Sequence, residues 1–222
     1  MINLIDEIIE RVPPLDAVTV CRAAFLKRVP GVDVTTDKPQ ALNLLEAAHR
    51  EARRQLGLGD WPLITAEQVH GNQIAVIDRP IKQDQDLSGY DGFITNQQRV
   101  GLAIYVADCC AVYIVDPKTP AVGLVHSGKR GTQLGIAADA IQQMQRQFGS
   151  SPADLIVYLS PCIRPPHYEV DFGAQIRDQC RLAGVEAIHD SGVCTACDLK
   201  SYYSYRAEKG KTGRMLALLG LV

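Results

Sequence analysis

Residues 102–131 read LAIYVADCCAVYIVDPKTPAVGLVHSGKRG and contain three short apolar runs of strand length: Leu102–Ala107, Ala111–Val115 and Ala121–Val125. Apolar runs without alternation are typical of strands that are covered on both faces of a sheet. Polar or Pro-containing turns separate the runs. We therefore expect three central strands, with Cys109 at the end of one and His126 at the end of another, where sheet proteins often collect functional groups.

Helices are expected on both sides of this segment. Apolar residues recur at helical spacing from Ala41 to Leu56, with Gly57 as a stop signal. After the strands, one continuous helix is predicted over Thr132–Phe148 and another over Phe172–Ala183. The apolar tail Met215–Val222 is expected to dock as a helix. Shorter apolar segments predict further strands at Val18–Phe25, Gln73–Ile77, Gly92–Thr95 and Asp154–Leu159.

The composition is that of a globular protein that acts on a small molecule. The 222 residues are 46% hydrophobic and 22% charged, and we expect residues 1–222 to form a single domain. Since 23 Lys and Arg stand against 25 Asp and Glu, there is no electrostatic case for nucleic acid or an anionic membrane as the main partner. Residues 1–14 carry no export pattern, and no apolar run reaches 18 residues, so we expect a cytoplasmic protein with reduced Cys.

Three metal-capable side chains stand beside turn-forming or small residues: His70, Cys109 and His126. The 38 and 16 residues between them match no compact zinc finger, so a shared site requires the fold to bring them together. Two imidazoles and one thiolate suit zinc, and three protein ligands leave a fourth tetrahedral position open. Each of these His is alternatively an ordinary surface or core residue, as we expect for His49 and His189.

A Gly-rich basic segment, Gly128–Thr132, precedes the strongest predicted helix. Free backbone N–H groups of the first helical turn and the side chains of Lys129 and Arg130 would together form an anion site. An ordinary tight turn with solvated cations is the alternative interpretation. The segment lacks the Walker spacing, and no Rossmann glycine pattern follows a strand, so ATP and NAD receive little support.

Other polar groups are weaker candidates. Cys194-Thr195-Ala196-Cys197 has redox or zinc spacing, but no second Cys pair accompanies it, and we expect a structural role. Asp108 either orients a ligand or caps a strand end, and Glu169 is a candidate acid or base. Arg206 either closes over a substrate anion or is a surface cation. His167, which follows two prolines, receives no role.

The chain carries several short motifs in one order: Gln68-Val69-His70-Gly71, Asp91-Gly92, Ala107-Asp108-Cys109, His126-Ser127-Gly128-Lys129-Arg130-Gly131, Tyr168-Glu169-Val170, Ser204-Tyr205-Arg206 and Thr212-Gly213-Arg214-Met215. This set resembles the YfiH family, whose members are described as polyphenol oxidase or laccase-domain proteins and as zinc-dependent purine nucleoside phosphorylases. The likeness runs from about Glu67 to the C-terminus, roughly seven-tenths of the chain.

The resemblance implies an α/β fold, a layered sandwich of mixed β-sheets flanked by helices. It is similar to the catalytic domain of cytotoxic necrotizing factor toxins, where a Cys and a His do hydrolytic work. The family's three metal ligands map onto His70, Cys109 and His126. The chain departs from the family at Lys129, where Trp is usual, and at Ala207, where a second Arg is usual.

The implied activity is that of a purine nucleoside phosphorylase, a glycosyltransferase. It would cleave adenosine, inosine, guanosine or S-methyl-5'-thioadenosine with phosphate as co-substrate, giving the free base and ribose 1-phosphate. The resemblance also implies adenosine deaminase activity, a hydrolase reaction, at a Zn²⁺ site. The expected catalytic residues are His70, Cys109, His126 and Arg130. The expected substrate-binding residues are Lys129, Glu169 and Arg206.

Three alternatives remain open at this point. The first is a Cys-His hydrolase with Cys109 as nucleophile and His126 as its base. The second is a copper-dependent polyphenol oxidase, although one His/Cys/His site does not supply the four coppers of a true laccase, so Zn²⁺ is favoured over Cu²⁺. The third is a zinc-binding module without activity. In each case the expected state is a monomer or a weak homo-oligomer.

Overall fold

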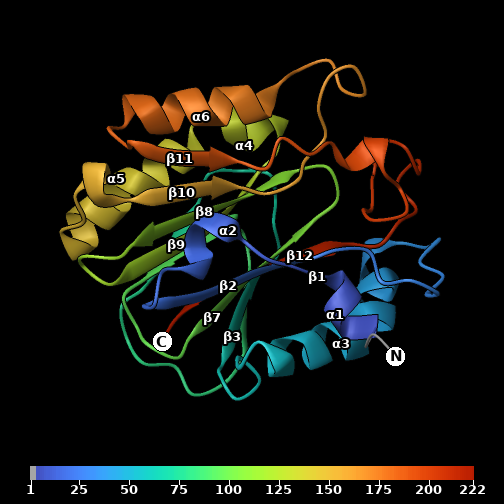
Figure 1. Cartoon of the computed structure of the whole chain (residues 1–222), viewed down its shortest axis with the longest axis horizontal. Coiled ribbons are helices and arrows are strands. Elements are labelled where there is room, and N and C mark those ends of the chain that lie inside the picture. Colours follow the sequence, from blue (N-terminus) through green and yellow to red (C-terminus); the bar gives the residue numbers. More distant parts are fainter. Residues whose placement is uncertain (1–3) are drawn as a thin grey trace.

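The computed structural model describes residues 4–222. Two six-stranded mixed β-sheets are stacked on each other and lie between helices (Figure 1). The first sheet has the order β1 (Ile9–Glu10), β2 (Cys21–Leu26), β12 (Met215–Leu221), β7 (Gly101–Val106), β3 (Leu63–Ala66) and β5 (Gln85–Leu87). The second has the order β11 (Ala187–Asp190), β10 (Ile156–Leu159), β8 (Cys110–Asp116), β9 (Ala121–Ser127), β6 (Gly92–Thr95) and β4 (Ile74–Ile77). Met1–Asn3, part of the N-terminal segment considered above, lie outside the described residues.

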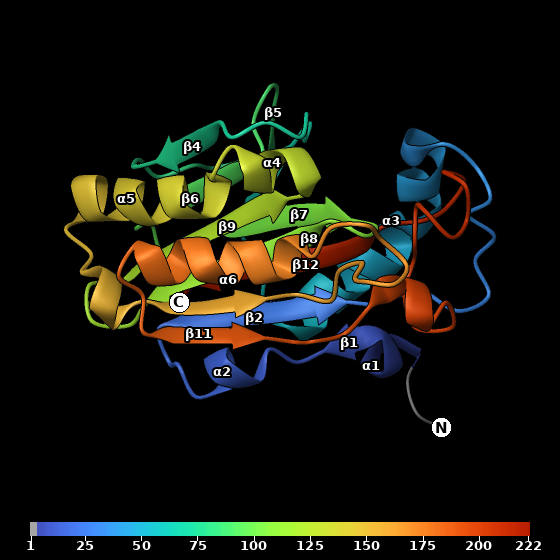
Figure 2. The ribbon, with the colours of Figure 1, turned by 90° about the horizontal axis from the view of Figure 1, so that it is seen from above.

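Helices cover the outer faces of the two sheets (Figures 1 and 2). α5 (Ile136–Phe148) and α6 (Phe172–Leu182) pack on the second sheet, and α3 (Lys38–Gln55) lies on the side of the first. The shorter helical segments are α1 (Leu4–Ile8), α2 (Pro13–Asp16), α4 (Lys129–Gln133), η1 (Pro152–Asp154) and η2 (Thr195–Cys197). The expected α/β sandwich of mixed sheets flanked by helices is therefore confirmed. In the part of the chain that the structure describes, no helix is long and apolar enough to cross a membrane.

The central strands agree with the sequence pattern, but they belong to different sheets. β8 and β9 are buried along their whole length and lie side by side in the second sheet. β7 lies in the first sheet, so the chain changes sheets at residues 107–109. The Tyr113 hydroxyl of β8 donates a 2.7 Å hydrogen bond to the carbonyl of Ala24 in β2, which links the two sheets across the core.

The C-terminal segment is a strand, and the prediction of a helix there was wrong. Met215–Leu221 pairs antiparallel with β2 on one side and with β7 on the other, and all seven residues are buried. A short continuous apolar run fits either a buried helix or a buried strand, and periodicity alone does not separate the two. The two partner strands, both distant in sequence, make it a strand.

The helix predicted over Thr132–Phe148 is two helices, α4 and α5. Gly135 stands between them with a φ of 81°, a left-handed conformation that ends one helix before the next begins. The N-terminus of the long helix is therefore not at Thr132, and the predicted cradle of backbone N–H groups belongs only to the five-residue α4. By contrast, the predicted helix over Ala41–Leu56 is confirmed as α3, which starts earlier because the Asp37 side chain accepts from the Gln40 N–H at 3.0 Å.

Candidate metal centre and active site

The structure brings together the three side chains that the sequence singled out. The ligand atoms of His70, Cys109 and His126 all lie within 4.8 Å of one another. The two imidazole rings stand edge to face, with their centroids 4.8 Å apart and an interplanar angle of 76°. No local motif produces this grouping, because the three residues come from the β3–β4 loop, the crossing between the sheets, and β9.

Strand register explains the convergence. In the antiparallel β8–β9 pair, Ala111 lies opposite His126, so the residue that enters β8, Cys109, lies beside the end of β9. β6 is the other neighbour of β9, and the His126 N–H donates to the Asp91 carbonyl at 2.7 Å. His70 comes from the loop that leads into β4, the strand beyond β6. Four chain segments thus meet where the neighbouring strands β4, β6, β9 and β8 of the second sheet begin or end.

The backbone around the site adopts left-handed conformations that non-glycine residues rarely take. Gln68, His70 and Asp108 have φ angles of 62°, 61° and 81°. Hydrogen bonds hold the first of these turns in place, because the Gln68 amide donates to the Tyr105 carbonyl at 2.7 Å and accepts from the Tyr105 N–H at 3.0 Å. Strained backbone conformations persist only where the surrounding contacts hold them in place, and they are common at functional sites.

A buried carboxylate, Asp91, orients both imidazole-bearing segments. Its Oδ1 accepts from the His70 N–H at 2.8 Å and lies 2.9 Å from His126 Nδ1, while its Oδ2 accepts from the Gly71 N–H at 2.6 Å. Burial alone would raise the pKa of Asp91, but its bonds to His126 and to these backbone N–H groups lower the pKa. Nδ1 of His126 therefore faces a carboxylate, which leaves Nε2 free to bind a ligand. This role was not predicted, since the local pattern at Asp91-Gly92 indicates only a turn.

The Cys109 thiol is held in a setting that favours the thiolate. Burial would raise its pKa, but the charge and hydrogen bond of His126, with a further hydrogen bond from His70, lower it to about 6. Burial would lower the pKa of His126, but Cys109 and Asp91 raise it to about 9. Without a metal, the pair is therefore a thiolate and an imidazolium near neutral pH. A thiolate is both the form that binds metals and the form that attacks electrophiles.

The donors and the space around them fit a zinc ion. Gly128 packs directly on the site, since a Cβ atom there would lie only 2.6 Å from Cys109 Sγ. Two imidazoles and a thiolate are the ligands that zinc accepts, and three protein ligands with an open fourth position are typical of catalytic zinc. His70 is exposed and Cys109 is half-buried, so an ion held by these residues would be reached from solvent.

The three donors lie in the wall of a cavity of about 740 Å³. The same wall is rich in cations, namely Lys38, Lys129, Arg130, Arg206, Lys209 and Arg214. Arg130 makes no ion pair with any residue between 4 and 222, so its guanidinium is available to an anion in the cavity. Two of its neighbours, Lys129 and Arg206, share the exposed Glu169, with nitrogen-to-oxygen distances of 3.2 Å each. All four predicted anion- or substrate-binding residues are therefore at or beside the cavity.

Aromatic rings also line the cavity. The Arg206 guanidinium lies 4.8 Å from the centroid of the Tyr168 ring, and Phe172 stands edge to face with Tyr168. Flat apolar surfaces of this kind suit an aromatic base. The cavity wall thus combines His and Cys donors, cationic side chains and aromatic rings.

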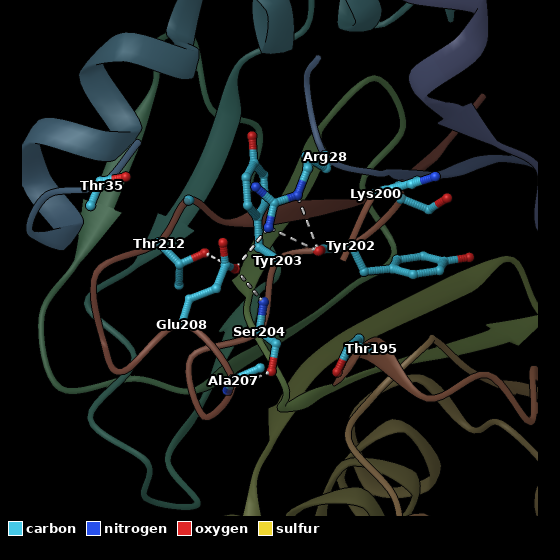
Figure 3. A network of polar contacts seen from close by, with 12 residues as sticks. Arg28, Thr35, Thr195, Lys200, Tyr202, Tyr203, Ser204, Ala207, Glu208 and Thr212 are labelled. Carbon is cyan, nitrogen blue, oxygen red and sulfur yellow. Dashed lines mark hydrogen bonds and ion pairs between the residues drawn. The ribbon is translucent and has the colours of Figure 1, made fainter. Parts of the chain in front are cut away.

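Two carboxylates, Asp108 in the cavity wall and Glu208, hold the segment around Arg206. Asp108 accepts from the Arg206 N–H at 2.7 Å and from the Thr195 hydroxyl at 2.7 Å, so it positions the Arg206 segment rather than capping a strand end. Figure 3 shows Glu208 next to Ser204; its carboxylate accepts from Arg28 at 2.7 Å and from the Ser204 N–H at 3.0 Å. Hydrogen bonds at the Arg206 N–H and at the Ser204 N–H therefore set the position of Arg206.

Comparisons with known proteins agree with this description. A family model described as multi-copper polyphenol oxidoreductase laccase matches residues 31–181 and 170–222. The purine nucleoside phosphorylase YlmD of Geobacillus stearothermophilus is 32% identical over 207 residues, which cover 73% of this chain and 76% of the relative. The purine nucleoside phosphorylase ORF3 of Streptomyces griseus is 28% identical over 212 residues, with 83% of each chain covered.

Two solved structures have the same fold. The crystal structure of YlmD from Geobacillus stearothermophilus superposes with a TM-score of 0.80 at 26% identity and covers 96% of this chain and 98% of that one. The crystal structure of the Bacillus licheniformis hypothetical protein YfiH also gives a TM-score of 0.80, at 24% identity, and covers 94% and 98%. The chain therefore belongs to the family described as multi-copper polyphenol oxidoreductase laccase, together with the YfiH and YlmD proteins.

Proposed function

We propose that this protein is a zinc-dependent purine nucleoside phosphorylase. The observation that carries the proposal is that His70, Cys109 and His126 lie in the wall of one cavity together with Arg130, which makes no ion pair among residues 4–222. The relatives that are named purine nucleoside phosphorylases support it. The proposed substrates are adenosine, inosine, guanosine and S-methyl-5'-thioadenosine, with inorganic phosphate as co-substrate.

The cationic side chains of the cavity wall are proposed to hold phosphate. Arg130 offers a planar fork of N–H donors that matches two phosphate oxygens, and Lys129 and Arg206 stand on either side of Glu169. In phosphorolysis a phosphate oxygen bonds to the anomeric carbon, while the bond from that carbon to the purine nitrogen breaks and leaves its electrons on the base. A fixed phosphate both serves as the nucleophile and stabilises the cationic ribosyl group at the transition state.

The metal ligands are proposed to be His70, Cys109 and His126, with Asp91 orienting them. When bound, the ion supplies positive charge that stabilises an anionic group and lowers the pKa of a water molecule. Asp91 fixes the ring of His126 and the backbone of residues 70–71, so that the donors need no rearrangement. We include hydrolytic removal of the amino group of adenosine among the proposed activities of this metal centre.

Product analysis tests the proposal. Purified protein is incubated with inosine or adenosine, with and without phosphate. Ribose 1-phosphate is expected only when phosphate is present, while ammonia released from adenosine without phosphate reports deamination. Cys109→Ser should remove both activities, and Cys21→Ser, in β2 and outside the cavity, should retain them. Absence of product from both nucleosides under both conditions would overturn the proposal for these substrates.

A Cys-His hydrolase is the second candidate, and one observation favours it. The pKa of Cys109 is lowered to about 6 by His126, which is the arrangement of a nucleophilic thiol with its base. Metal analysis and alkylation separate the two functions. A liganded thiolate is protected from alkylation until zinc is chelated, whereas a nucleophilic thiolate reacts at once.

A further inference from the structure

A second group of His and Cys side chains lies outside the cavity wall. His167, in the loop between β10 and α6, faces the two thiols of the Cys194–Cys197 segment. The ligand atoms of the three residues all lie within 4.8 Å of one another. The sequence pattern left the Cys pair without a partner, because the 26 residues between His167 and Cys194 form no known local motif. The fold supplies the third donor.

The distances match those of a tetrahedral zinc site. His167 Nδ1 lies 3.8 Å from Cys194 Sγ and 3.5 Å from Cys197 Sγ. With Zn–S near 2.3 Å and Zn–N near 2.0 Å, tetrahedral geometry puts nitrogen and sulfur about 3.6 Å apart. Both distances therefore fit one ion bound between the three atoms. Two thiolates and an imidazole favour zinc and exclude magnesium and calcium, which take oxygen ligands.

The backbone of the two loops is held in register without any ion. Cys162 and Cys194 form a parallel β-bridge, in which the Cys162 N–H donates to the Val193 carbonyl and the Thr195 N–H donates to the Cys162 carbonyl, both at 3.2 Å. Close by, Arg164 forms an ion pair with Asp190. The donors are thus presented by a preorganised frame, and an ion that bound there would lose little affinity to reorganisation.

We propose that His167, Cys194 and Cys197 bind one zinc ion, independently of the site in the cavity. Both Cys release their thiol protons to solvent when they bind, and no change of oxidation state is involved. His167 and Cys197 are exposed, so zinc enters directly from solvent and a water molecule takes the fourth position. The proposal does not depend on the function proposed above.

This ion would join the two loops that carry one wall of the cavity. His167 immediately precedes Tyr168 and Glu169, which contact Arg206. Between the two Cys, Thr195 donates to Asp108, the residue that holds the Arg206 backbone. The second ion is therefore a structural clamp behind the substrate wall rather than a reacting centre.

Zinc content tests the proposal directly. The full chain, without a purification tag that binds metal, is expected to retain two zinc ions per molecule when purified from zinc-supplemented medium. Cys197→Ser and Cys109→Ser should each retain one, and the double variant none. The controls Cys21→Ser and His189→Gln, an exposed His outside both groups, should retain two. His167→Gln is the second variant, and circular dichroism checks that each variant is folded.

Cobalt binding to the Cys109→Ser variant isolates the second site. Added Co²⁺ should produce thiolate-to-cobalt charge-transfer absorption with a stoichiometry of one, and this absorption should be lost when Cys197→Ser is added. One zinc per wild-type chain with no change in Cys197→Ser would overturn the proposal. A Cys194–Cys197 disulfide in freshly purified protein, seen as a mass lower by two hydrogen atoms, would overturn it in favour of a redox pair.

Discussion

The two His and Cys groups of this protein have nearly the same donors but opposite surroundings. In the first, the buried Asp91 hydrogen-bonds to His126 and to the His70 N–H, and the donors lie in the wall of a cavity lined with cations. In the second, His167 and Cys197 are exposed, and the third donor residue, Cys194, forms a β-bridge with Cys162. Both donor sets suit zinc, but the surrounding charges and space determine whether a site can act on a substrate.

The strongest test of this contrast removes one thiolate from each group. In Cys109→Ser, nucleoside cleavage should fall by more than about 100-fold, because losing a ligand costs more than losing a supporting partner. In Cys197→Ser, kcat should stay within about threefold of the wild type. Steady-state assays with inosine and phosphate measure both. An equal loss in the two variants would show that the second group also takes part in the reaction, and the contrast would fail.

The next test replaces one carboxylate associated with each group, Asp91 or Asp190, with an amide. Asp91→Asn should weaken zinc binding at the first site by about 10- to 100-fold, because Asn carries no charge and replaces one acceptor with a donor. Asp190→Asn, which removes the partner of Arg164 in the loop frame, should weaken only the second site. Competition with a chromophoric chelator measures each affinity in variants that lack the other site. Unchanged affinity in Asp91→Asn would mean that Asp91 does not support the metal ligands.

A smaller effect is expected from the cation beside the first group. Arg130→Ala should raise the KM for phosphate by about tenfold or more and leave zinc content unchanged, since a hydrogen bond to a charged group contributes at least about 1.5 kcal/mol. The matched control is Arg146→Ala, an exposed residue of α5. Initial rates at varied phosphate provide the measurement. A change in the KM for nucleoside alone would place Arg130 against the sugar or base instead of phosphate.

The smallest expected difference is in thiol reactivity after both metals are removed. Because His126 lowers the pKa of Cys109 to about 6, its thiolate forms below neutral pH and its alkylation rate should be flat above about pH 7. The pKa of Cys197 is raised, mainly by its hydrogen bond with Cys194 and then by burial, so its rate should still increase beyond pH 9. At pH 7 the two rates should differ only severalfold, because a thiolate of low pKa is also a weaker nucleophile.

Iodoacetamide labelling followed by peptide mass spectrometry gives both pH profiles in one experiment. His126→Gln removes the charge that stabilises the Cys109 thiolate, so its profile should shift to higher pH and resemble that of Cys197. A Cys109 profile that still rises steeply above pH 8 in the wild type would contradict the thiolate–imidazolium pair.

Several parts of the site were predictable from the sequence, and others were not. The donor types of His70, Cys109 and His126 and their places at strand ends were visible, because each depends on residue identity and on a short apolar run nearby. Asp91 was not visible as their partner, since its bonds to residues 70, 71 and 126 arise only when β4, β6 and β9 lie side by side. The same holds for His167, which meets the Cys pair across two loops.

Residue types and periodicity were enough to predict the buried strands β7, β8 and β9, the helices α3 and α6, and the chemistry available at the ends of the strands, because these are local properties. Three other features come from tertiary contacts: residues 215–221 form a strand, Gly135 divides a predicted helix, and the chain changes sheets beside Cys109. These features depend on partners distant in sequence, whose packing and hydrogen bonds outweigh local preference.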